Sequence, residues 1–295
     1  MKINKHIRKI WGKACYRWMD LTLPNNTATP IIRLENPATN YPDDVRSSLL
    51  FYTAADSVYF HSYGAAFLNA IYTNTNQSAV HVHLFNPEKC QIDWLSDFRR
   101  HTRYPLSFSW EHVDLSELDS EKKGRFYYAT RFYRFHEIVR KFNLPSMCLD
   151  IDALLIRDID VQMSGFEKKN IDVAFYERFD KRGDNTKLLA GTLYVRPTSS
   201  GLSFLSDVSN QIRRFIENKV LIEKIDQIIL YDFFKRYAKH GKLKFSGLKY
   251  PIIDLNFTED GIIWYPKGNS KNHSVYLRKK DEMSSKGIPT SPADY

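Results

Sequence analysis

The sequence lacks any long hydrophobic run. A membrane-spanning helix needs roughly 18 or more consecutive apolar residues, and no stretch of the 295 residues approaches that length. The first residues also lack the apolar block of a secretory signal. These absences predict a soluble protein that is not exported, so we expect it in the cytoplasm.

Cysteine is scarce as well. The three cysteines, Cys15, Cys90 and Cys148, are widely spaced, odd in number and without the paired spacing of zinc ligands. The sequence therefore indicates neither a disulfide framework nor a zinc site. This usage fits the reducing cytoplasm.

Positive charge is in excess. The chain has 43 lysines and arginines against 34 acidic residues, which gives a formal net charge of +9. Such an excess favours an anionic partner, and nucleic acid, a membrane surface and a phosphorylated small molecule all qualify. Charge alone does not choose among them, and a basic but otherwise ordinary surface is equally open.

The N-terminal region combines basic and apolar residues. Apolar side chains recur there at three- and four-residue spacing, which predicts a basic amphipathic helix over residues 1–20 that rests on an anionic membrane. The alternative is that Trp11 and Trp18 pack on the rest of the protein. Residues 21–46 are rich in proline and predict an extended arm. We therefore expect an N-terminal helix and arm over 1–46, a globular domain over 47–276 and a polar tail over 277–295.

Within the globular part, apolar runs alternate with segments of helical periodicity. Residues 48–53 and 79–85 predict buried strands, and residues 63–73 and 128–142 predict helices. This alternation is typical of an α/β domain with a mostly parallel sheet covered by helices.

Two carboxylates interrupt the apolar stretch over residues 146–156. Alternate residues of a strand point the same way, so Asp150 and Asp152 are expected to converge on one point. Two like charges in apolar surroundings are costly unless a positive charge lies between them. Hard oxygen ligands favour Mg²⁺ or Mn²⁺, which complete their shells with water and substrate phosphate oxygens. The alternative is a pair of aspartates that cap a strand end without a ligand.

Other short motifs accompany this pair in a fixed order along the chain. They are Ala54-Ala55-Asp56-Ser57-Val58-Tyr59, Phe132-Tyr133-Arg134, Leu149-Asp150-Ile151-Asp152, Ala190-Gly191-Thr192-Leu193, Asp226-Gln227, and the segment from Tyr265 through Gly268 to Lys271. Together they resemble the retaining GT-A glycosyltransferases of family 8, in particular the bacterial lipo-oligosaccharide galactosyltransferases. The resemblance covers about residues 50 to 275, the whole inferred domain.

The resemblance implies a fold and an activity. The fold is a GT-A type nucleotide-sugar-binding domain with a mostly parallel mixed sheet flanked by helices. The activity is transfer of a hexose from a UDP-sugar to a glycan, lipid-linked or other acceptor, with Mn²⁺ or Mg²⁺ and with retention of configuration.

The resemblance also implies site residues. Asp226 and Gln227 would act at the sugar, and Asp150 and Asp152 would hold the metal. The remaining donor-binding candidates are Ala54, Asp56, Tyr59, Arg131 or Arg134, Gly191, Gly268 and Lys271.

Plain structural roles stay open for three of these residues. Tyr59 could be a core residue, Arg134 a solvent-facing helix residue, and Asp226 a helix N-cap.

The sequence departs from the family at three positions. Phe132 replaces the tyrosine of the family's Tyr-x-Arg motif. Leu189 replaces the asparagine that precedes Ala-Gly, which removes a polar contact to the sugar. Tyr265 replaces the histidine that is the third metal ligand, and a phenol is a poorer ligand than an imidazole at neutral pH. His273 is the candidate substitute, and a surface histidine is its alternative interpretation.

Two rival functions remain. Phosphatases of the haloacid-dehalogenase type also end a strand in Asp-x-Asp, but their motif lies near the start of the domain and continues into Gly-Thr. Here it lies in mid-chain and continues into Ala153-Leu154. Nucleic-acid binding through the basic surface lacks a recognisable module, so we expect no nucleic-acid partner.

Overall fold

The computed structural model describes residues 37–40, 47–75, 78–102, 105–181 and 183–286. Its centre is an eight-stranded mixed sheet with the strand order β1-β4-β3-β2-β5-β8-β7-β9. The neighbours β2, β3, β4 and β5 run parallel, whereas β8 is antiparallel to both β5 and β7. The strands are β1 (Ala38–Asn40), β2 (Leu49–Asp56), β3 (Ser78–Phe85), β4 (Leu106–Glu111), β5 (Ser146–Leu149), β7 (Val173–Glu177), β8 (Leu188–Val195) and β9 (Phe245–Gly247).

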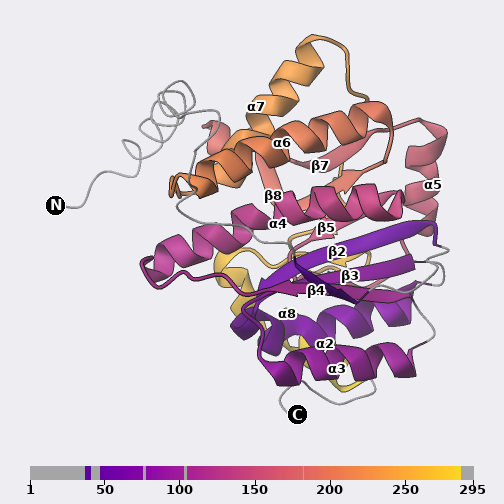
Figure 1. Cartoon of the computed structure of the whole chain (residues 1–295). Helices are drawn as coiled ribbons and strands as arrows, with labels where there is room; N and C mark the ends of the chain where they lie inside the picture. The colour runs from indigo at the N-terminus through magenta and orange to yellow at the C-terminus, as the bar shows by residue number, and fades with distance from the viewer. Residues whose placement is uncertain (1–36, 41–46, 76–77, 103–104, 182, 287–295) are drawn as a thin grey trace.

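Helices cover both faces of this sheet (Figure 1). Helices α4, α6 and α7 lie on one side, and α2 and α3 lie on the other. The helices are α2 (Ser57–Asn74), α3 (Lys89–His101), α4 (Ser120–Phe142), α5 (Asp160–Lys168), α6 (Ser199–Glu217), α7 (Ile225–Lys239) and α8 (Ser274–Ser285), with short 3₁₀ turns η1 (Asp184–Thr186) and η2 (Gly268–Asn272). The predicted α/β architecture is confirmed.

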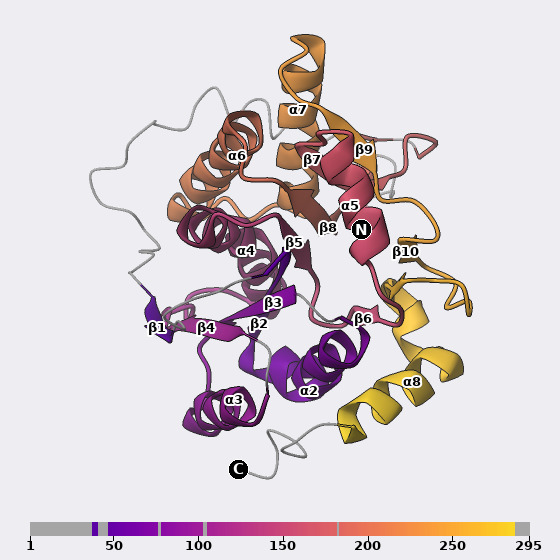
Figure 2. The same cartoon turned by 90° about the vertical axis from the view of Figure 1, so that its right-hand side faces the viewer.

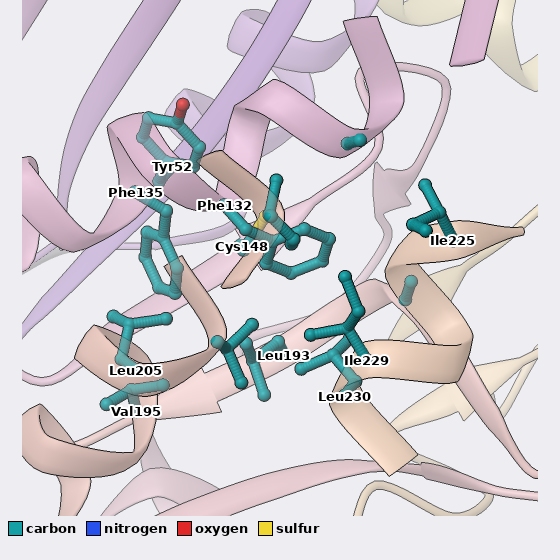
Figure 3. Packing of buried hydrophobic residues seen from close by; sticks show 14 of the residues in the cluster. Tyr52, Phe132, Phe135, Cys148, Leu193, Val195, Leu205, Ile225, Ile229 and Leu230 are labelled. Carbon is teal, nitrogen blue, oxygen red and sulfur yellow. The ribbon is translucent and has the colours of Figure 1, made fainter. Parts of the chain in front are cut away.

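Strand β2 shows why the sheet is buried on both faces. Its sequence is almost continuously apolar, as expected for a parallel strand covered by helices on each side. Leu50 and Tyr52 point into the cluster beneath α4, α6 and α7, and Leu49 and Phe51 point into the cluster beneath α2 and α3. Figure 3 shows the first cluster, in which side chains from β2, α4, β8, α6 and α7 pack together.

The four segments predicted from periodicity are confirmed as β2, α2, β3 and α4. Helix α4 begins earlier than expected because Asp119 caps it, and the Asp119 side chain accepts a hydrogen bond from the Lys122 amide at 2.8 Å. None of the helices that the structure describes is long and apolar enough to cross a membrane. The amphipathic helix predicted over residues 1–20 lies outside the described residues and stays a prediction.

The structure differs from the expected domain boundaries at both ends. Ala38–Asn40, expected in the arm, forms strand β1 and pairs with β4. The expected polar tail begins inside α8, which lies beside α2 (Figure 2) and packs on it. Tyr276 and Met283 of α8 are buried. The Asn69 side chain also donates a hydrogen bond to the Met283 carbonyl at 2.9 Å. The domain therefore continues to Ser285, because Tyr276 and Met283, two turns apart on one face of α8, attach this helix to the rest of the domain.

A second, three-stranded sheet lies beside the first. It consists of β10 (Ile253–Asp254), β11 (Ile263–Trp264) and β6 (Leu154–Leu155). Strand β6 follows the Asp150–Ala153 turn, and β11 leads directly into Tyr265. This small sheet therefore brings the turn after β5 and the segment over 265–271 to the same place.

Candidate functional site

A cavity of about 470 Å³ opens where β2 and β5 end. Ligands of open α/β sheets bind beyond the carboxyl ends of the strands, and this cavity lies there. Most of the residues predicted as site residues line it: Ala54, Asp56, Tyr59, Arg131, Asp150, Asp152, Gly191, Asp226, Gln227 and Lys271. The sequence motifs, far apart along the chain, thus converge on one cavity.

Asp150 and Asp152 do not lie on a strand. Strand β5 ends at Leu149, and the next residues form a turn in which the Ala153 amide donates to the Asp150 carbonyl at 2.9 Å. The expected same-side geometry from strand alternation was therefore wrong. Both carboxylates still line the cavity, but each has its own partners.

Both carboxylate oxygens of Asp150 are engaged. One accepts a hydrogen bond from Arg131 of α4, and the other accepts one from the Tyr265 hydroxyl. Gly191 of β8 lies directly against these groups, and a Cβ atom there would collide with the Tyr265 hydroxyl and the Asp150 carboxylate. Glycine is therefore required at this position so that the carboxylate can approach the strand.

Arg131 joins Asp150 to the start of α7. The Arg131 guanidinium is buried, and its other terminal nitrogen lies 3.2 Å from Asp226. Burial raises the pKa of Asp226, and the charge of Arg131 opposes that shift. Asp226 lies in the first turn of α7, while Lys224 holds the N-cap position. The N-cap alternative for Asp226 is therefore wrong.

Asp152 is held differently. It is almost fully buried, one of its oxygens forms an ion pair with Lys271, and the other has no hydrogen-bond partner. Burial raises the pKa of the Asp152 carboxyl, and Lys271 opposes that shift. From α8, the Tyr276 hydroxyl donates to the Asp152 carbonyl at 2.6 Å and fixes the turn.

This arrangement fits a divalent cation. A buried carboxylate oxygen without a partner is costly, and a metal ion would satisfy it. The described residues contain no group of three or more acidic, histidine or cysteine side chains placed to bind one. Mg²⁺-like ions need only one or two carboxylates when water and substrate phosphates complete the shell, so a pair of aspartates is compatible with such an ion.

His273 does not complete this set. It is exposed at the N-terminus of α8, where its ring packs 5.6 Å from that of Phe257, and it does not line the cavity. The prediction of His273 as a metal ligand is not supported, because its ring packs on Phe257 away from the residues that line the cavity. Tyr265, at the position of the family's histidine, bonds Asp150 instead.

Aromatic and cationic groups meet where α2 begins. Asp56 caps α2, and its side chain accepts a hydrogen bond from the Tyr59 amide at 2.8 Å. Tyr59 is 45% exposed and lines the cavity, so it is not a core residue. The Lys271 ammonium lies 5.0 Å from the centre of its ring. This edge of the cavity therefore offers a flat aromatic surface beside a positive charge.

Arg134 does not reach the cavity. It is buried and forms two hydrogen bonds with the Glu111 carboxylate, at 2.8 and 2.6 Å, and another with Glu137 at 2.8 Å. Its place on α4 directs it toward β4, whereas Arg131 points toward β5. Of the two arginines that the sequence analysis offered for donor binding, Arg131 therefore lines the cavity and Arg134 does not.

Several lining residues were missed by the sequence analysis. They include Tyr127, Tyr128, Glu223, Lys224 and Lys267. Three of them lie close to a motif in the chain, which could have indicated them. Glu223 and Lys224 come shortly before Asp226, and Lys267 lies inside the segment from Tyr265 to Lys271. Gly268 does not line the cavity, but its φ of +58° allows the turn that places Lys267 and Lys271 there.

Comparisons with known proteins identify the fold. No family model matches the chain, and no curated protein matches it. The glycosyltransferase GlyE of Streptococcus pneumoniae TIGR4 superposes with a TM-score of 0.51 at 14% identity, over 79% of this chain and 60% of that chain. An active-site mutant of LgtC superposes with a TM-score of 0.54 at 9% identity, over 81% of this chain and 96% of that chain.

These likenesses concern the fold. The chain has the same α/β architecture as these glycosyltransferases, which is the GT-A type that the motifs predicted. It spans about 60% of the length of GlyE and nearly the whole of LgtC.

Proposed function

We propose that this protein is a glycosyltransferase that moves a hexose from a nucleotide-sugar, a UDP-sugar by our expectation, to a glycan, lipid-linked or other acceptor. One observation carries the proposal. A single cavity at the strand ends holds two aspartates of one turn, a lysine and an arginine paired with them, and an exposed tyrosine. The fold shared with GlyE and LgtC supports it.

The nucleotide would lie against the start of α2. Tyr59 offers an exposed ring for stacking on the base, and Asp56 is placed beside it by its capping bond. The adjacent Lys271 would then face the diphosphate. Its ammonium, now paired with Asp152, would neutralise negative charge that develops on the leaving group.

Asp150 and Asp152 would hold Mn²⁺ or Mg²⁺, which supplies further positive charge to the diphosphate when it is bound. Arg131 holds Asp150 in place, because the guanidinium bonds both Asp150 and Asp226. Gly191 keeps the strand close enough for this contact.

The sugar would lie toward the start of α7. Gln227 lines the cavity there, and its side-chain oxygen accepts a hydrogen bond from Arg178 at 3.4 Å. Asp226 is buried against Arg131, so its role in this proposal is to position that arginine, and Gln227 is the group that meets the sugar. Retention of configuration follows from the family resemblance.

Nucleotide binding tests the donor site. Asp152→Asn should lower Mn²⁺-dependent UDP affinity at least about tenfold while the melting temperature stays near that of the wild type, because the isosteric amide keeps the turn but loses the charge.

Lys271→Ala should weaken the binding of UDP far more than the binding of uridine. Exposed Lys168 on α5 offers the matched control, since Lys168→Ala removes the same charge away from the cavity. Undiminished Mn²⁺-dependent UDP binding by Asp152→Asn would contradict the proposal.

Turnover separates the rival functions. A glycosyltransferase should release UDP from a UDP-hexose in the presence of Mn²⁺, whereas a phosphatase would hydrolyse p-nitrophenyl phosphate and a nucleic-acid-binding protein would do neither. Thermal shift against a panel of nucleotide-sugars would identify the donor, because a ligand that binds only the native state stabilises it by mass action.

A further inference from the structure

A second group of cations, distinct from Arg131 and Lys271, gathers at the α7 side of the cavity. Its members are Arg178, Lys181, Lys224 and Lys267, and we call them the acceptor-side cations. Arg178 and Lys181 follow β7, Lys224 precedes α7, and Lys267 precedes η2. Lys224 and Lys267 line the cavity. Three separate segments therefore bring positive charge to one place.

Few acidic side chains neutralise the acceptor-side cations. Among the described residues, neither Arg178 nor Lys267 forms an ion pair with an acidic side chain. Lys181 and Lys224 pair only with their chain neighbours, Asp180 at 3.2 Å and Glu223 at 3.5 Å. Pairs exposed to this degree contribute little, so the group keeps an excess of positive charge.

Two further observations indicate that these cations lack a counter-ion. The Nε atom of Arg178 is buried without a hydrogen-bond partner. Burial, together with repulsion from Arg178, Lys224 and Lys181, lowers the pKa of Lys267 to about 8. A bound anion would relieve both conditions. The N-terminus of α7, a 15-residue helix, adds the positive end of its dipole at Lys224.

These cations are separate from those assigned to the donor. Lys271 contacts Asp152 and the rings of Tyr59 and Tyr63, which is the nucleotide side. Arg178 instead contacts Gln227, the residue placed beside the sugar. In the proposed geometry, an acceptor that approaches the sugar past Gln227 meets the acceptor-side cations.

We propose that the acceptor carries an anionic group, a phosphate or a carboxylate, and that Arg178 and Lys267 bind this group. The inference rests on the proposed glycosyltransferase function. The anion could belong to an acidic saccharide or to a phosphorylated lipid carrier, because both present the same oxygen acceptors to a guanidinium and an ammonium.

The test uses the full-length protein saturated with UDP and Mn²⁺, so that added anions meet only the acceptor side. Glucuronate and glucose form one probe pair, and geranyl phosphate and geraniol form the other. We expect at least one anion to bind tenfold or more tightly than its uncharged partner, by calorimetry. The pair that shows the difference identifies the source of the charge.

Variants then assign the residues. Arg178→Gln and Lys267→Gln should each weaken binding of that anion at least tenfold and change UDP affinity less than twofold. Lys271→Ala should do the reverse, and Lys168→Gln should change neither. A general loss of positive charge would not produce these opposite effects on anion binding and UDP binding.

Several results would overturn the inference. One is equal binding of charged and uncharged probes, and another is anion binding that survives both substitutions. A loss of UDP affinity as large as the loss of anion affinity would assign Arg178 and Lys267 to the diphosphate instead. A preference for UDP-glucuronate over UDP-glucose that both variants abolish would place the charge on the donor. Failure of UDP to bind the wild type would refute the proposed function, while anion titration without UDP would still report on these cations.

Discussion

At the scale of single residues, Asp150 and Asp152 are chemically unlike although only one residue separates them. Asp150 gives both oxygens to Arg131 and Tyr265, whereas Asp152 keeps one buried oxygen without a partner. An oxygen already bonded to an arginine has less to offer a cation than a buried oxygen with no partner. Substitution of Asp152 should therefore reduce metal-dependent binding more than substitution of Asp150.

Gly191 gives the sharpest test at this scale. In Gly191→Ala the new methyl group would meet the Tyr265 hydroxyl and the Asp150 carboxylate, so these must move away from the strand. Overpacking of this kind costs about 1–3 kcal/mol in the free energy of unfolding. We also expect at least about a tenfold loss of UDP affinity with Mn²⁺, because Asp150 is displaced. Urea unfolding and calorimetry measure the two effects.

Gly165 supplies the control. A Cβ at this α5 position meets nothing within 4 Å. Gly165→Ala should therefore leave UDP binding unchanged and raise the free energy of unfolding by up to about 1 kcal/mol, as alanine is the better helix former. Unchanged UDP binding in Gly191→Ala would show that Asp150 does not need its present position.

At the scale of elements, α4 links the core of the sheet to the cavity. Arg131 and Arg134 lie about one turn apart on α4. The helix therefore contributes Arg131 to the cavity and Arg134 to a buried ion pair with Glu111. Arg134 and Glu111 form a doubly hydrogen-bonded pair with both side chains almost fully buried. On its other side Glu111 accepts a hydrogen bond from His83 at 3.1 Å, if that ring nitrogen carries the proton. We infer that this pair holds α4 in the position from which Arg131 reaches Asp150.

Glu111→Gln tests that inference. Removing the charge of Glu111 leaves the buried Arg134 with only the partly exposed Glu137 as a partner, and breaking a buried pair in this way costs up to about 3–5 kcal/mol in the free energy of unfolding. UDP affinity should fall as well, because a displaced α4 moves Arg131. Glu137, the partly exposed second partner of Arg134, offers the matched change: Glu137→Gln should cost less than about 1 kcal/mol. Equal losses in the two variants, measured by urea unfolding, would refute the role given to Glu111.

At the scale of the whole molecule, buried histidines couple stability to pH. Burial lowers the pKa of His81, His83 and His136, and the neighbouring charges of His83 and Arg140 add to this effect at His81 and His136. His81 and His83 form a chain of hydrogen bonds with Ser107 and Ser109, and neutral imidazole rings are able to form these hydrogen bonds.

Stability should therefore fall toward acid. A histidine with a lowered native pKa is neutral in both states above its unfolded value of about 6.5, so it does not change stability there. Below that pH the unfolded chain binds the proton first, and each such group lowers the free energy of unfolding by at most about 1.4 kcal/mol per pH unit. Urea unfolding at pH 7.5, 6.5 and 5.5 measures the slope. His136→Gln should reduce it, and a pH-independent stability over this range would contradict the assignment.

The sequence by itself determined the architecture and indicated part of the candidate site. Apolar runs and helical periodicity predicted β2, α2, β3 and α4, because burial on both faces of a parallel sheet leaves a pattern in the chain. The ordered motifs predicted nine of the residues that line the cavity, and Arg131, the alternative to Arg134, is the tenth. Short motifs at strand ends carry this information, since a strand and the loop that follows it are local in sequence.

Only the tertiary structure decided which side chains meet. In the structure Arg131 lines the cavity and Arg134 does not, and β5 ends before Asp150. His273 lies outside the cavity, and the acceptor-side cations lie together. These outcomes depend on how α4 is rotated against the sheet, on where a strand loses its pairing partner, and on which loops the small sheet holds together. Each is set by contacts between residues far apart in the chain, so no local pattern of residue types contains it.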